Sequence, residues 1–144
     1  MKAINCLKKI RIMDAKIEAD IMEIAELEAL ATKTTSVMGG ERVQASSSQQ
    51  KMADCVVKIV TMKEQLAKEI EEYLGYKADV KGMITEACDA DCCRLLCKRY
   101  FQDGTWEQIA VEMGFTYQWV SGGLHQKALS QLQKALDERT KEEG

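Results

Sequence analysis

The chain has 144 residues, of which 46% are hydrophobic, 30% are charged and only 6% are aromatic, and its formal net charge at pH 7 is −3. This hydrophobic content excludes a disordered chain. The net negative charge argues against a protein that binds nucleic-acid phosphates over a wide surface. Proline is absent and helix-forming residues dominate, so we expect an all-α protein.

Residues 3–34 carry a heptad pattern of apolar residues that predicts one long helix. Cys6, Met13 and Leu27 lie three residues after the leading heptad position, and Asp20 breaks the pattern once. The leading position itself is filled by Ala3, Ile10, Ile17, Ile24 and Ala31. Residues 35–50 hold a glycine pair and a serine run without periodicity, which predicts a flexible loop.

A second heptad pattern covers residues 51–87, with Met52, Ile59 and Leu66 in its leading position. The two patterns have similar length and are joined by the loop, so they predict a long antiparallel helical hairpin over residues 1–87. The apolar stripes are also wide enough to bury a second hairpin, and a homodimer is therefore compatible with them.

Residues 88–102 predict a third helix, which contains a dense cysteine cluster and a basic cluster. The cysteines are Cys88, Cys92, Cys93 and Cys97, and the basic residues are Arg94, Lys98 and Arg99. A tetrahedral zinc site normally takes pairs of cysteines from two elements, whereas these lie on one helix. We therefore expect free thiols and no metal, with metal binding or redox sensing as the alternative.

The segment 104–136 predicts a helix-turn-helix, and residues 88–144 are expected to form a separate domain around it. Thr105 and Gln108 form a capping box at the start of the first helix. Gly114 suits the left-handed conformation that ends a helix in a sharp turn. Thr116 then caps the second helix, and Val120 anchors it. In DNA-binding proteins this arrangement places a recognition helix in the major groove.

This part of the chain resembles region four of bacterial sigma factors. Arg99-Tyr100, the run Thr105–Ala110 and the pair Ala128-Leu129 match the family pattern. With Lys51–Val60, the whole chain resembles the ArpU-like regulators of phages and prophages. The resemblance implies a sequence-specific DNA-binding regulator of phage late genes. Residues 120–127 depart from the pattern because they hold two glycines and no arginine, and the second helix is one residue longer.

The resemblance and the helix-turn-helix together indicate which residues contact double-stranded DNA. The recognition helix offers Thr116, Tyr117, Gln118, Ser121 and His125, with Lys127 toward the backbone. Arg94, Lys98 and Arg99 are expected to approach DNA or host RNA polymerase, or to form a solvated face. Trp119 is expected to pack in the core. Because no nucleophile–base pair, carboxylate dyad or phosphate loop is visible, we expect neither an enzyme nor a cofactor.

Two other classes of function remain open. A small-terminase-like DNA-packaging component also joins a helix-turn-helix to an oligomerising helical region. A protein–protein adaptor that has lost DNA binding would explain the acidic charge and the glycine pair. For every class we expect a cytoplasmic protein of the bacterial host cell without a membrane segment.

Overall fold

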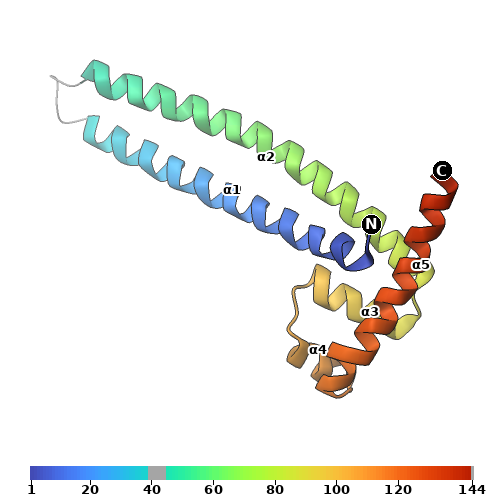
Figure 1. The fold of residues 1–144 in the computed structure, drawn as a ribbon. Coiled ribbons are helices and arrows are strands. Elements are labelled where there is room, and N and C mark those ends of the chain that lie inside the picture. The colour runs from blue at the N-terminus through green and yellow to red at the C-terminus, as the bar shows by residue number, and fades with distance from the viewer. Residues whose placement is uncertain (39–44, 144) are drawn as a thin grey trace. The chain divides into compact units, whose positions relative to one another are not determined.

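The structure is a computed structural model that describes residues 1–38 and 45–143. All regular structure in these residues is helical, which confirms the all-α class, and two helices are far longer than the rest: α1 (Ala3–Met38) and α2 (Ala45–Ala87) (Figure 1). The shorter elements are α3 (Ala90–Leu96), η1 (Cys97–Phe101), α4 (Trp106–Met113), η2 (Trp119–Leu124) and α5 (His125–Glu143), where η1 and η2 are π-helical turns. Within the described ranges, no helix is both long and apolar enough to cross a membrane.

The loop expected over residues 35–50 is largely helical. Residues 35–38 continue α1, and residues 45–50 form the first turns of α2. Residues 39–44 lie outside the described residues. Serine and glutamine have only modestly lower helix propensity than alanine, so a serine run next to an apolar heptad can extend the helix.

The chain divides into two compact units, and their boundary differs from the one expected after residue 87. Unit 1 comprises Met1–Met13 and Tyr73–Gly144, and unit 2 comprises Asp14–Glu72. The first turns of α1 and the last turns of α2 therefore belong with the helix-turn-helix. The remaining length of both helices makes up unit 2.

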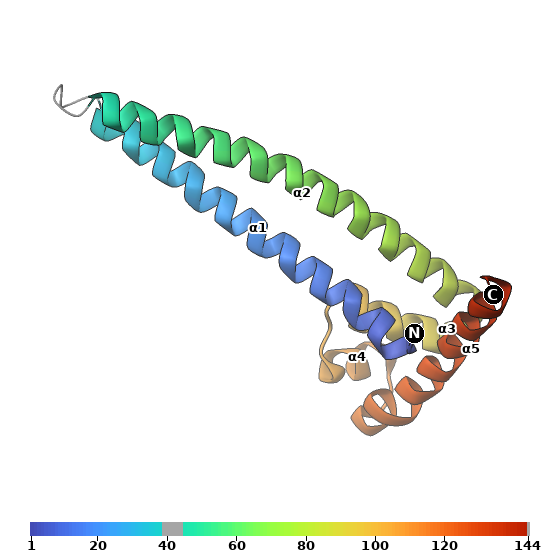
Figure 2. The ribbon, with the colours of Figure 1, turned by 45° about the horizontal axis from the view of Figure 1, so that its top comes forward.

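Unit 1 has one hydrophobic core to which all its elements contribute. The first turns of α1 and the last turns of α2 supply Ala3, Cys6, Leu7, Ile10, Val80, Met83 and Ile84, all buried. The shorter helices, which gather around these turns in Figure 2, supply Cys92, Leu95, Leu96, Tyr100, Ile109, Ala110, Val120, Leu124, Ala128 and Leu132. Polar contacts hold α1 in place, because the Tyr76 hydroxyl donates to the Cys6 carbonyl at 2.9 Å and the Ala3 amide donates to Gln133 at 2.7 Å.

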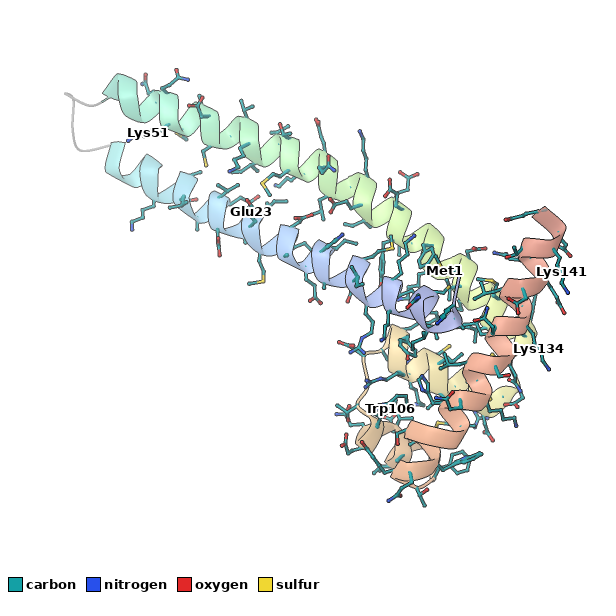
Figure 3. The ribbon with its side chains drawn as sticks, viewed as in Figure 1. Met1, Glu23, Lys51, Trp106, Lys134 and Lys141 are labelled. Carbon is teal, nitrogen blue, oxygen red and sulfur yellow. The ribbon has the colours of Figure 1, made fainter. Side chains whose placement is uncertain are left out.

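Unit 2 consists of two antiparallel arms, whose side chains are drawn in Figure 3. The arms are joined by an ion pair between Lys63 and Glu28 at 2.7 Å. The seam contains a pair of carboxyl groups where the heptad breaks: a hydrogen bond with Asp20, followed by burial, raises the pKa of Glu69. Among the described side chains of unit 2, only Ile17 and Ile24 are buried, so the arms cover each other incompletely.

Candidate nucleic-acid interface

The first helix of the helix-turn-helix is α4, and its start is capped as expected. The Gln108 amide donates to the Thr105 hydroxyl at 3.2 Å, and the Gln108 side chain accepts from the Thr105 amide at 3.1 Å. These two bonds satisfy donors that a helix N-terminus leaves unpaired. Ile109 and Ala110 are buried, which fixes α4 on the core of unit 1.

The turn between the two helices is built by Gly114 and Thr116. Gly114 has a φ of 72°, a left-handed conformation that costs glycine little. The next residue, Phe115, donates its amide to the Ala110 carbonyl at 3.0 Å. Thr116 then accepts from the Trp119 amide at 3.2 Å and thereby caps the second helix. Both capping residues and the turn glycine were predicted from the sequence, and the structure confirms them.

The second helix begins at Tyr117, passes through a π-helical turn, η2, and continues as α5. One extra residue per turn is typical of such π-bulges, which occur often at functional sites. The bulge coincides with Gly122 and Gly123. Val120 and Leu124 are buried, so the bulged turn is held firmly on the core of unit 1.

The exposed start of this helix is the candidate recognition surface. Thr116, Tyr117 and Gln118 are exposed, as expected for residues that contact DNA. Ser121 is half-buried, and its hydroxyl donates to the Tyr117 carbonyl at 2.7 Å. Gln118 is therefore the exposed amide side chain at the start of the helix, and an amide can pair with adenine through two hydrogen bonds.

Trp119 does not pack in the core, contrary to the prediction. Its side chain is 43% exposed and lies over the backbone of Gly123. Three more large side chains around the turn are exposed: Val111 (83%), Phe115 (37%) and Tyr117 (46%). We call Val111, Phe115, Tyr117 and Trp119 the turn patch. The sequence analysis did not predict this patch. A signal for it was present, because the glycine four residues after Trp119 leaves room for the ring to lie on the backbone.

His125 is half-buried and packs against Tyr100 and Trp106 within unit 1, a placement that does not fit the prediction that it contacts DNA. Its Nε2 atom lies 2.9 Å from the Tyr100 hydroxyl. The Trp106 ring meets the imidazole edge-on, with 4.8 Å between the ring centroids. Burial, followed by the charge of Arg99, lowers the pKa of His125. The imidazole therefore stays neutral and links the third helix to α5.

This environment predicts that unit 1 loses stability on acidification. In the unfolded chain His125 takes up a proton near its ordinary pKa of about 6.5. The folded protein resists protonation because the pKa is lowered, so acid favours the unfolded state below that pH. Urea unfolding at about pH 7.5 and 5.5, followed by tryptophan fluorescence, should show a smaller pH effect in His125→Gln. An equal pH effect in both proteins would contradict this expectation.

Lys127 forms an exposed ion pair with Asp89. Its Nζ atom lies 3.0 Å from Asp89 Oδ2. Asp89 caps α3 by accepting from the Cys92 amide at 2.9 Å, and it also accepts from Gln131. The Cys92 amide, then Gln131, then Lys127 hold the pKa of Asp89 far below its usual range. Lys127 thus joins α5 to the cap of α3, and its role at the DNA backbone stays a prediction.

The basic cluster of the third helix is also engaged within unit 1. Lys98 lies 2.7 Å from Glu112, and Arg94 lies 3.8 Å from Asp91. Arg99 donates to the Gly104 carbonyl at 3.0 Å and stacks on the Trp106 ring at 4.4 Å. Arg94 is the most exposed of these cations, with 65% of its side chain accessible. Its contact with DNA stays a prediction.

The four clustered cysteines are free thiols: Cys88 precedes the cap of α3, Cys92 and Cys93 lie in α3, and Cys97 begins η1. Burial is the main cause that raises the pKa of Cys88 and Cys97 to about 11 and that of Cys92 to about 12. These thiols are therefore protonated at neutral pH and are weak nucleophiles. The described part of the chain contains no group of three or more histidine, cysteine or acidic side chains placed to hold a metal ion.

Comparisons of the chain with protein families, with curated proteins and with solved structures found no match. Its function is therefore inferred from the residues and their geometry.

Proposed function

We propose that the protein is a sequence-specific DNA-binding transcriptional regulator of the sigma region-four type, acting at phage late genes in the cytoplasm of a bacterial host. The observation that carries the proposal is the exposed start of the second helix. Thr116, Tyr117 and Gln118 face solvent there, while Val120 and Leu124 fix the helix from behind. A rigid, capped helix that presents polar side chains at its N-terminal end is the arrangement that major-groove readers use.

The roles of the surface residues follow from their chemistry. Gln118 would read adenine through paired hydrogen bonds. Thr116 and the unpaired amides beside it would receive a phosphate, because a helix N-terminus attracts anions. Since Lys98 and Lys127 are paired with carboxylates, each subunit neutralises few phosphates. The affinity for DNA would then depend weakly on salt. A second subunit, or host RNA polymerase as a second contact, would supply the remaining binding free energy.

The proposal predicts that Gln118→Ala reduces discrimination between specific and non-specific DNA by about 1–3 kcal/mol. Bound fragments selected from a phage genome provide the specific duplex, which is titrated at several salt concentrations. Gln126→Ala is the matched control, because Gln126 is exposed on α5 beyond the π-helical turn and should leave discrimination unchanged. If no fragment binds at low salt, the DNA-binding proposal is wrong.

A protein–protein adaptor is the second candidate, and the turn patch favours it. Val111, Phe115, Tyr117 and Trp119 expose apolar surface at the place where a DNA reader presents polar and cationic groups. Aromatic residues are enriched at the centres of protein interfaces. If the wild type captures host RNA polymerase but binds no DNA fragment, and Phe115→Ala with Trp119→Ala loses that contact, the patch serves a protein partner and the adaptor reading is supported.

A further inference from the structure

The candidate recognition surface carries no charge. No aspartate, glutamate, lysine or arginine occurs between Glu112 and Lys127, a segment that includes the turn and the exposed start of the second helix. His125 lies in this segment, but burial lowers its pKa, and the imidazole stays neutral. The surface that would enter the major groove of DNA therefore presents neutral side chains to the bases.

This neutrality restricts which base pairs the surface can read. In the major groove, arginine or lysine reads guanine and aspartate or glutamate reads cytosine, and the segment has none of these residues. Serine and threonine can pair with several bases, but the Thr116 hydroxyl accepts from the Trp119 amide and the Ser121 hydroxyl donates to the Tyr117 carbonyl. Gln118 remains, and its amide matches adenine. The polar side chains of this surface therefore favour A·T pairs.

The exposed aromatic rings beside Gln118 favour the same base pairs. Tyr117 and Trp119, its neighbours in the chain, are 46% and 43% exposed. The Trp119 ring lies over the backbone of Gly123, which holds the ring against the helix. In the major groove the 5-methyl group of thymine is the apolar group that such side chains contact. Against a G·C pair the same rings would cover polar atoms that find no partner, which costs free energy.

We propose that the recognition surface is specific for A·T pairs, with Gln118 on adenine and the rings of Tyr117 and Trp119 on the 5-methyl groups of thymines. This inference rests on the proposed function and names the sequence class that the same surface reads. Two residues of the turn patch then serve base recognition. Val111, the patch residue on α4, has no such role, because the first helix of the motif crosses the DNA backbone.

The test replaces thymine by deoxyuridine in a duplex that the full-length protein selects from phage-genome fragments. This replacement removes the methyl group and keeps the base pairing. Each contacted thymine that is replaced should raise the dissociation constant about 4-fold, the equivalent of about 0.8 kcal/mol for one buried CH₂-sized group. Deoxyuridine outside the region that the protein protects should leave the dissociation constant unchanged, which controls for altered flexibility of the duplex.

Variants assign the effect to the rings. Tyr117→Ala with Trp119→Ala should bind thymine and deoxyuridine duplexes equally, whereas Val111→Ala, at an 83% exposed residue of α4, should keep the wild-type difference. Loss of the difference in Val111→Ala as well would overturn the assignment to the two rings.

The comparison of the two duplexes with the wild type needs no variant. If the wild type binds DNA but tolerates deoxyuridine throughout the protected region, or selects G·C-rich sites, this inference is wrong and the proposed function stands. If no fragment binds at low salt, the proposed function is wrong and this inference fails with it.

Discussion

Leu7→Ala is expected to lower the free energy of unfolding of unit 1 by about 2–5 kcal/mol. Leu7 is completely buried although it lies in the second turn of a helix that the sequence assigns to a hairpin. It packs in the same core as Leu95, Leu96 and Leu132 of the shorter helices. Truncation of Leu7 to alanine leaves a cavity in this core. The surrounding helices cannot move far enough to fill it, because caps and hydrogen bonds hold them in place.

Both tryptophans, Trp106 and Trp119, belong to unit 1, so their fluorescence during urea unfolding reports on this unit. Ile12→Ala is the matched control, because Ile12 lies in the same stretch of α1 and is 54% exposed. It should cost less than about 1 kcal/mol. Equal effects of Leu7→Ala and Ile12→Ala would show that α1 does not complete the core around the helix-turn-helix.

The division between the two units could not be read from the sequence. The apolar heptads of α1 and α2 continue past Met13 and Tyr73, at the boundary between the units. A heptad indicates that one face of a helix is covered, but it does not indicate by which segment. Leu7 and Ile10 contribute to the core that contains the shorter helices, whereas Ile17 and Ile24 belong to unit 2. Only long-range packing distinguishes these residues.

The caps and the turn were predictable because their causes are local. Thr105 and Gln108 satisfy each other's amides within four residues, and Gly114 adopts its left-handed conformation for steric reasons alone. The positions of His125 and Trp119 depend instead on the π-helical turn. In a regular α-helix His125 lies seven residues after Gln118 and therefore on the same exposed face. One extra residue in the turn rotates His125 by about 100° toward the core.

Gly123→Ala is expected to destabilise unit 1 by about 1–3 kcal/mol, because the added methyl group meets the Trp119 ring. A Cβ atom at Gly123 would lie 2.6 Å from Trp119 Cε3, which is too close for any carbon pair, whereas a Cβ atom at Gly122 would meet nothing within 4 Å. Gly122→Ala should therefore stabilise the helix by about 0.5–1 kcal/mol, since alanine restricts the unfolded chain. Alanine at these two adjacent positions is therefore expected to change the free energy of unfolding in opposite directions.

A double-mutant cycle separates this cause from a general intolerance of the π-helical turn. In a Trp119→Ala background the ring is gone, and Gly123→Ala should become neutral or stabilising, as Gly122→Ala is. The difference between the two backgrounds gives the coupling between Gly123 and Trp119. Urea unfolding followed by circular dichroism measures all four proteins, because Trp119 is absent from two of them. If Gly123→Ala costs the same in both backgrounds, the glycine serves the bulged backbone itself, and the exposure of Trp119 in the turn patch needs another cause.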